Sequence, residues 1–133
     1  MDISIHGVYS NSQKKFISIP EICNPGESTL IDFLEILKQG YGFLEMHNNN
    51  DNYQAPQNLQ LYTDFGRYML LFGVIEDEEY EVKTLCNPLA PATLIDMHGE
   101  PFPARAIVND FQPIAAACLE FLRTGNVVGV LLI

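Results

Sequence analysis

The side chains with the greatest capacity for chemistry form an acidic block in the middle of the sequence. Five of its six positions are carboxylates, interrupted only by Tyr80: Glu76, Asp77, Glu78, Glu79 and Glu81. Carboxylates can transfer protons, but a catalytic carboxylate is usually partly buried beside a group that shifts its pKa. A run of like charge repels itself and stays in water. The block is therefore typical of an exposed turn that forms an electrostatic surface, and it does not indicate an active site.

The histidines and cysteines show no pattern of a metal site or of an activated nucleophile. His6, His47 and His98 lack the spacing of metal ligands, so a metal site would require them to converge from separate segments. Cys86 and His98 could pair as nucleophile and base beside Arg105, but no spacing supports this arrangement. The sequence has no G-x-S-x-G, P-loop or G-x-G-x-x-G motif. We therefore predict no catalytic residue, metal ligand or cofactor, and we do not expect an enzyme.

Two further features allow either a binding role or ordinary packing. The segment Glu100–Arg105 (EPFPAR) places a rigid aromatic stretch beside an arginine. Phe102 could be a recognition residue, or it could pack into the core while Arg105 pairs with a local acid such as Asp110. The tyrosines Tyr53, Tyr62 and Tyr80 could belong to a protein-binding surface or to cross-strand pairs within a sheet.

The distribution of charge restricts the class of partner. The formal net charge of the 133-residue chain is −10. Between residues 39 and 120 the only basic side chains are Arg67, Lys83 and Arg105, against twelve acids. Nucleic acid is a poor partner because phosphate binding needs clustered lysine and arginine. A basic protein suits this surface better, although acidity also serves solubility alone.

Three features of the sequence indicate the cellular compartment in which the protein is expected. Cys23, Cys86 and Cys118 are scattered and odd in number, which favours free thiols in a reducing environment. The N-terminus MDISIHGVYS lacks the basic and apolar regions of a signal peptide, and no apolar run approaches the ~20 residues of a membrane helix. We predict a cytoplasmic protein that does not bind a membrane.

Alternation and helical periodicity predict the elements that position these residues. Strands are expected at residues 2–9, 16–19, 41–47, 59–62, 67–74, 79–85 and 93–97. An Asn-rich loop is expected at residues 47–58, between the third and fourth of these strands. Helices are expected from Ser28 as N-cap to Gly40, and from Asp110 as cap to Leu122. The positive charge of Arg123 would interact favourably with the dipole at the C-terminal end of the second helix. The prediction is a single α+β domain over residues 1–133, with an antiparallel sheet of about five or six strands and two helices packed on one face.

The second half of the sequence resembles a known group of proteins. It contains LQLYTDFGRYMLLFG, the acidic turn, EYEVKTLCNPLAP, GEPFPARAIVNDF and a closing helix that ends in Glu120-Phe121-Leu-Arg-Thr124-Gly125. Over residues 58–128 this outline resembles the small α+β immunity proteins of bacterial polymorphic-toxin and contact-dependent inhibition systems. The resemblance implies that the protein binds and neutralises one cognate toxin domain.

The resemblance and the charge pattern together give a specific expectation. Toxins that act on nucleic acid usually have basic clefts, so the acidic block Glu76, Asp77, Glu78, Glu79 and Glu81 would steer the toxin, with Tyr80 as an anchor. The alternatives are an adaptor or chaperone for a secreted effector, and a small enzyme built on Cys86, His98 and Arg105. We expect a monomer, or a weak homodimer paired through a free sheet edge.

Overall fold

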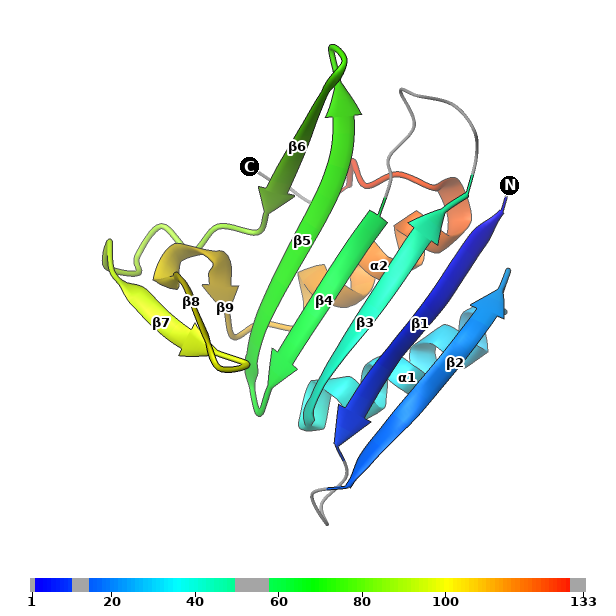
Figure 1. Ribbon diagram of the computed structural model, residues 1–133, viewed down its shortest axis with the longest axis horizontal. Helices are drawn as coiled ribbons and strands as arrows, with labels where there is room; N and C mark the ends of the chain where they lie inside the picture. Colours follow the sequence, from blue (N-terminus) through cyan, green and yellow to red (C-terminus); the bar gives the residue numbers. More distant parts are fainter. Residues whose placement is uncertain (1, 11–14, 50–57, 130–133) are drawn as a thin grey trace.

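The main sheet of the computed structural model is antiparallel, with the strand order β2-β1-β3-β4-β5-β6 (Figure 1). The structure describes residues 2–10, 15–49 and 58–129, and of Glu76 only the backbone. The strands are β1 (Ile3–Ser10), β2 (Phe16–Cys23), β3 (Tyr41–Asn48), β4 (Asn58–Asp64), β5 (Arg67–Glu76) and β6 (Glu79–Thr84). A two-residue strand, β9 (Ile107–Val108), pairs with β5 beyond the last residue of β6.

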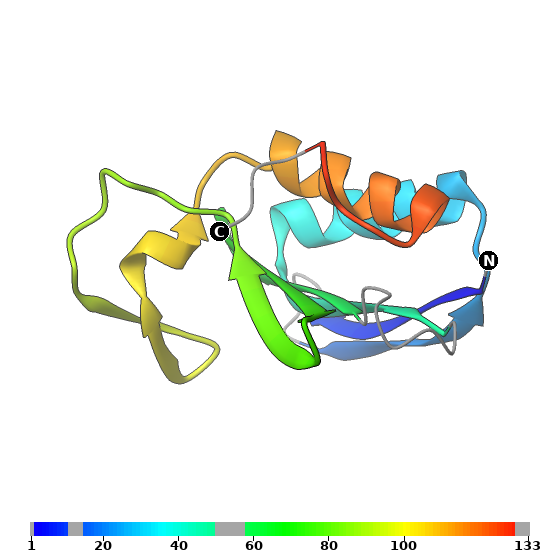
Figure 2. The same ribbon diagram turned by 90° about the horizontal axis from the view of Figure 1, so that it is seen from above.

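Two helices cover one face of this sheet, side by side (Figure 2). They are α1 (Glu27–Gln39) and α2 (Gln112–Thr124). The predicted α+β class is therefore confirmed, and so are the antiparallel sheet and the two helices on one face. Strands β4, β5 and β6 follow one another as an antiparallel meander. The main path of the sheet has six strands, in agreement with the prediction of about five or six; β9 pairs with β5 off this path, and a separate hairpin forms beside the sheet.

Strict alternation along the strands builds the main core. The inward residues of β3 are buried one after another, whereas the residues between them are half-buried on the outer face. Helical spacing predicts an apolar stripe of Leu30, Phe33, Leu34 and Leu37 on α1; the three leucines are buried against the sheet, and Phe33 is partly buried against the same core. In α2, Ile114, Ala117, Cys118 and Phe121 face the same core. The sheet and the helices thus share one continuous apolar layer.

The outer face of the sheet is covered at one end by a short second sheet. Strands β7 (Leu94–Met97) and β8 (Glu100–Pro103) form a hairpin, followed by the 3₁₀ turn η1 (Ala104–Ala106). Met97 from the hairpin and Ile107 from β9 pack on Met69 of β5, and all three are buried. Phe102 packs against this smaller cluster, so the packing alternative for Phe102 is the one the structure supports. β5 is therefore covered on both faces over this stretch.

The ends of the helices correct the predicted caps. Gly26, not Ser28, occupies the N-cap position of α1, and it makes no side-chain cap hydrogen bond. Ser28 lies inside the first turn, so its prediction as N-cap was wrong. At α2 the N-cap position is Phe111, but the carboxylate of Asp110 accepts a hydrogen bond from the backbone N–H of Gln112 at 3.0 Å. Asp110 thus performs the predicted capping from one position further upstream.

The Glu120–Gly125 motif has a structural task at the end of α2. The carboxylate of Glu120 accepts hydrogen bonds from the backbone N–H groups of Val128 and Gly129, at 2.7 and 2.8 Å. Phe121 is completely buried, and Gly125 adopts the left-handed conformation (φ 75°) that closes the helix. The motif therefore ends the helix and returns the chain onto the body of the protein.

Candidate functional site

The acidic block lies at the β5–β6 hairpin, as predicted. Asp77 and Glu78 are the two turn residues, and both have positive φ, 51° and 65°. This backbone conformation is the one that Asn-Gly favours in two-residue hairpins, because side chains other than glycine, asparagine and aspartate are strained there. Both side chains are exposed. The turn therefore places charge in water at the expense of local stability.

The arms of the hairpin point their side chains to opposite sides. Glu81 pairs with the inward-facing Val74, so Glu81 and Glu79 project on the helix side of the sheet. Tyr80 pairs with Ile75 and lies on the outer side. The predicted binding residues are brought together on one hairpin, but alternation separates Tyr80 from Glu79 and Glu81. A flat partner surface can therefore contact only one side of the hairpin. A partner that contacts Tyr80 as well as Glu79 and Glu81 must surround the hairpin tip.

Tyr80 is held in place although it is 57 % exposed. Its hydroxyl donates a hydrogen bond to Oδ1 of Asn58 at 3.3 Å, across β5. The ring crosses β5 at Gly73, where a Cβ atom would lie only 2.1 Å from the Tyr80 oxygen. Glycine at this position therefore leaves room for Tyr80 to lie flat on the outer face. Val82, the next outward residue of β6, is 52 % exposed.

Several rings pack against one another on the outer face over β3 and β4. Phe43 and Tyr62 face each other across β3 and β4 with ring centroids 4.9 Å apart, which supports the cross-strand alternative for Tyr62. His98, at the tip of the β7–β8 hairpin, stacks on Tyr41 at 4.1 Å and meets Tyr62 edge-on at 5.3 Å. Burial, and then the carboxylates of Glu100 and Glu45, raise the pKa of Tyr62, so its phenol stays neutral. Tyr53 lies outside the described residues.

At the other end of this face, two of the three histidines meet one carboxylate. His6 of β1 is paired directly with Glu45 of β3, and His47 lies two residues further along β3 on the same face. Nε2 of His6 lies 3.7 Å from Oε2 of Glu45, and Nε2 of His47 contacts Oε1 of the same carboxylate. The two imidazole rings are nearly parallel, at an interplanar angle of 14°. The spacing of these histidines in the sequence gives no sign of this arrangement, and the fold brings them together.

The nucleophile–base arrangement considered for Cys86 and His98 is not assembled. His98 lies at the tip of the β7–β8 hairpin, where its Nε2 lies 2.8 Å from the backbone oxygen of Thr63. Arg105 follows the base of the same hairpin, where its backbone oxygen accepts a hydrogen bond from Asn87, the neighbour of Cys86. The length of β7 and β8 therefore separates His98 from Arg105. These three residues do not support an enzyme mechanism.

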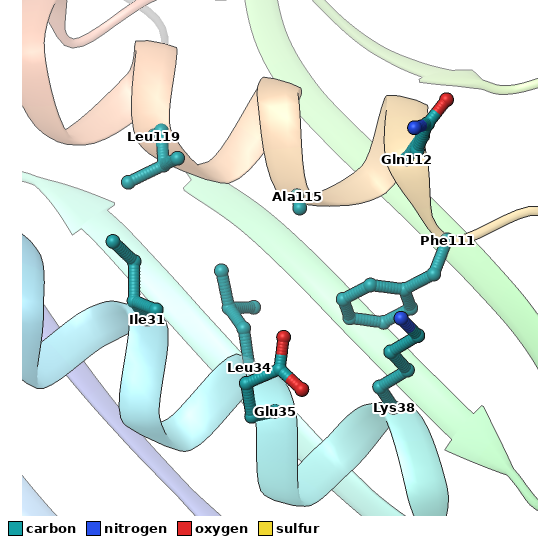
Figure 3. Close-up of a pocket in the computed structure, with 8 residues that line it drawn as sticks. All are labelled: Ile31, Leu34, Glu35, Lys38, Phe111, Gln112, Ala115 and Leu119. Atoms are coloured by element: carbon teal, nitrogen blue, oxygen red, sulfur yellow. The ribbon is translucent and has the colours of Figure 1, made fainter.

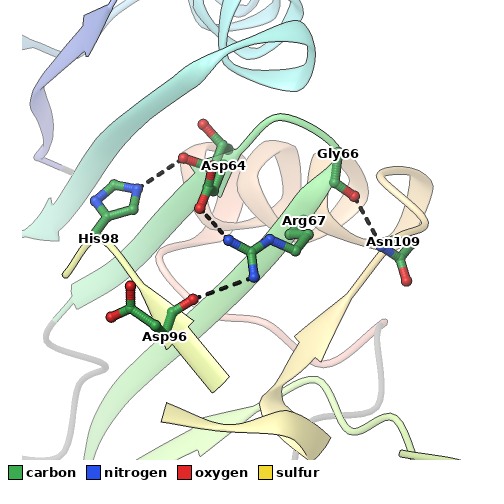
Figure 4. Close-up of polar contacts among 7 residues, drawn as sticks. Asp64, Gly66, Arg67, Asp96, His98 and Asn109 are labelled. Carbon is green, nitrogen blue, oxygen red and sulfur yellow. Dashed lines mark hydrogen bonds and ion pairs between the residues drawn. The ribbon is translucent and has the colours of Figure 1, made fainter. Parts of the chain in front are cut away.

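Polar contacts join the β7–β8 hairpin, and the residue that follows β9, to the β4–β5 turn (Figure 4). The guanidinium of Arg67 forms an ion pair with Asp64 and donates a hydrogen bond to the backbone oxygen of Asp96 at 3.3 Å. The side-chain amide of Asn109 donates to the backbone oxygen of Gly66 at 3.1 Å. Arg67, one of the few cations in this half of the chain, therefore has an internal structural role.

Two hollows in the described part of the chain are small. One groove of about 210 Å³ runs between α1 and α2, lined by Ile31, Leu34, Glu35, Lys38, Phe111, Gln112, Ala115 and Leu119 (Figure 3). A second, of about 280 Å³, lies at the base of the β7–β8 hairpin beside Leu94 and Arg105. Pockets for drug-sized ligands are usually ~300–1,000 Å³, so neither hollow indicates a substrate cavity.

Comparison with known proteins places the fold in a family. A family of unknown function (DUF6911) matches residues 2–131. The chain belongs to this family. No curated protein matches the sequence. Among solved structures, a hypothetical protein from Neisseria gonorrhoeae is similar, with a TM-score of 0.79 and 20 % identity over 98 % of this chain and 92 % of that chain. At this identity the likeness shows that the family's fold is shared.

The cluster of His6, Glu45 and His47 could be predicted only in part from the sequence. Glu45 and His47 are two residues apart in a predicted strand, so alternation alone places them on one face. His6 lies in another predicted strand, but nothing in the sequence fixes which strands are neighbours or in what register they pair. A search for ligand residue types two positions apart along predicted strands would have found Glu45 and His47, two of the three residues of the cluster.

Proposed function

We propose that this protein binds a basic partner protein through the β5–β6 hairpin, and that the partner is a toxin domain which the binding neutralises. The observation that carries the proposal is the shape and charge of the hairpin. Its last pair with β4 is Gly73 with Asn58, so Val74 to Glu81 extend beyond the described part of that strand (Figure 1). The exposed carboxylates of Asp77 and Glu78 lie at the end of this extension.

The hairpin combines the two contributions that protein recognition uses. Carboxylates in water create a potential that attracts a basic partner and raises the association rate. Tyr80 and Val82 add exposed apolar surface, and tyrosine is enriched among residues that dominate binding energy. Because Tyr80 is already held by Asn58, it loses little conformational freedom when a partner covers it.

The identity of the partner as a toxin rests on the resemblance of residues 58–128 to bacterial immunity proteins. The proposal places the protein in the cytoplasm, where its free thiols would remain reduced, as a monomer or weak homodimer. No helix in the described part of the chain has the length and apolar character needed to cross a membrane.

A charge-matched pair of variants tests the hairpin. The first variant carries Glu78→Lys, Glu79→Lys and Glu81→Lys, and the control carries Glu21→Lys, Asp32→Lys and Glu35→Lys on β2 and α1. All six side chains are exposed, and both triple changes raise the formal net charge from −10 to −4. The partner is first isolated by affinity capture from the source cells, identified, and titrated against each variant.

We expect the hairpin variant to lose at least about tenfold in affinity at physiological salt, mainly through slower association, and the control to bind like wild type. Equal affinity of the two variants would exclude the hairpin as the binding surface. The partner is also expressed alone in bacteria. Growth arrest that is relieved by co-expression of this protein supports neutralisation, whereas a harmless partner would favour the adaptor or chaperone alternative.

A further inference from the structure

The cluster of His6, Glu45 and His47 has a composition that no packing role requires. Each residue contributes one metal-binding atom, and the three atoms lie within 4.8 Å of one another. The backbone that carries them is regular antiparallel sheet, with His6 opposite Glu45 and His47 opposite Ser4. Their Cβ positions are therefore fixed by the fold, and the side chains converge over β1 and β3 on the outer face.

We propose that His6, Glu45 and His47 form a binding site for a divalent transition-metal ion, with zinc as the best-suited ion. Two imidazole nitrogens and one carboxylate oxygen form a donor set that zinc takes at sites with three protein ligands. Such a site leaves a further coordination position for water or for a donor from a bound molecule. Magnesium and calcium are poorer candidates, because they favour sites built of oxygen atoms.

The geometry requires only small side-chain movements to hold an ion. Zinc binds nitrogen and oxygen ligands at about 2.0–2.2 Å, so ligand atoms around one ion lie roughly 3.3 Å apart in tetrahedral geometry. Nε2 of His6 and Oε2 of Glu45, at 3.7 Å, are close to that separation. The carboxylate contacts His47 more tightly, so an ion entering between them would move the imidazole outward by rotation of its side chain.

The surroundings favour a site that is both anchored and accessible. The Glu45 side chain is only 15 % exposed, whereas His6 and His47 are 42 % and 40 % exposed. The carboxylate is thus held near the sheet between the two rings, while solvent reaches the imidazoles. Phe43 lies on the same face with its ring centroid 6.4 Å from that of His6, so one wall of the site is apolar. Electrostatic attraction of an ion is stronger beside such a wall than in bulk water.

A site of this kind is separate from the hairpin proposed above. It lies on β1 and β3, and β4 separates it from β5 and β6. Metal binding can therefore be tested whether or not the hairpin binds a protein. The simpler alternative is that Glu45 only accepts hydrogen bonds from two surface histidines.

Direct titration distinguishes these alternatives. The full chain, with any histidine tag removed, is stripped with a chelator and titrated with Zn²⁺ by calorimetry, and with Co²⁺ by its visible absorption. The variants are His6→Gln, Glu45→Gln and His47→Gln. The matched control is His98→Gln, which removes the remaining histidine of the chain from the far end of the same face.

We expect one Zn²⁺ per chain, and at least about 100-fold weaker binding in each cluster variant, since even outer-shell changes weaken metal sites about 10–100-fold. The control should bind like wild type, and NMR signals of His6 and His47, but not His98, should shift with Zn²⁺. Thermal unfolding in chelator shows whether each variant is folded. Absence of stoichiometric binding to wild type, or binding that Glu45→Gln leaves intact, would overturn the proposal.

Discussion

Arg123 in the last turn of α2 is joined to Glu27 in the first turn of α1. The guanidinium donates two hydrogen bonds to the carboxylate, one of them from Nη2 to Oε2 at 3.1 Å. The position of Arg123 near the end of α2 predicts an interaction with the dipole of its own helix, and the structure adds a partner 96 residues away. The pair connects the two helices at one end of the layer that covers the sheet.

This ion pair predicts a specific pH dependence of stability. The hydrogen bond from Arg123, together with its charge, lowers the pKa of Glu27. A lowered folded-state pKa contributes stability above the ordinary glutamate pKa, and that contribution is lost as pH falls through the lowered value. Both groups are at the surface, so the effect is small and weakens with salt. Denaturant unfolding at several pH values should show wild type and Glu27→Gln differing at neutral pH and converging in acid. A difference that persists in strong acid would contradict this origin.

Gly7 is predicted to be essential for pairing between β1 and β3. A Cβ atom at this position would lie 2.1 Å from the backbone oxygen of Phe43, which cannot move without distorting the sheet. Gly7→Ala should therefore lower the free energy of unfolding by ~1–3 kcal/mol or more, which is the usual cost of overpacking a protein core. The control is Gly26→Ala, where a Cβ meets nothing within 4 Å and a change within about 1 kcal/mol is expected. Similar denaturation midpoints for the two variants would refute the prediction.

Thr63 is predicted to be suboptimal for stability. Its side chain is fully buried, and its hydroxyl has no hydrogen-bond partner in the described part of the chain. A buried hydroxyl without a partner costs about 1–3 kcal/mol, so Thr63→Val should leave stability unchanged or raise it. Thr124→Val is the comparison, because that hydroxyl bonds to the backbone of Glu120 and Asn126, and its loss should destabilise. Calorimetric melting of both variants tests the difference in sign. A clear loss of stability in Thr63→Val would show that its hydroxyl is satisfied.

The three thiols should react at different rates. Cys118 is completely buried, and burial raises its pKa to about 12, so almost no thiolate forms near neutral pH. Cys23 is exposed and Cys86 is half-buried. Alkylation followed by mass spectrometry should modify Cys23 first, and Cys118 only when denaturant unfolds the chain. Modification of Cys118 at the rate of Cys23 would mean that the core opens readily under native conditions.

Local features of the fold were predictable because local physics determines them. The spacing of Leu30, Leu34 and Leu37 identified the buried face of α1, and the acidic block identified the β5–β6 turn. The cap of α1 was misplaced by two positions, since Ser28 has the right chemistry but Gly26 is the last extended residue before the helix begins at Glu27. The short strand β9 escaped prediction because two residues carry no period.

The arrangement of distant strands was not predictable from one sequence. The pairing of β1 between β2 and β3 decides that His6 lies beside Glu45, and it depends on the sum of many side-chain contacts across the sheet. A shift of one residue in that register would have turned His6 toward the helices. The candidate metal site is therefore a product of register, whereas the acidic hairpin is a product of local sequence. This difference explains why only the hairpin was anticipated.

Because Asp77 and Glu78 adopt left-handed backbone conformations, the charge of the hairpin can be reduced without loss of folding stability. Most changes that remove a functional side chain also weaken the fold, so lost binding and lost structure are hard to separate. Here, exchange of Asp77-Glu78 for Asn-Gly removes two carboxylates and supplies the residues that this turn favours. The altered protein would be less acidic and more stable. A fall in partner affinity in that protein could then be assigned to the missing charges alone.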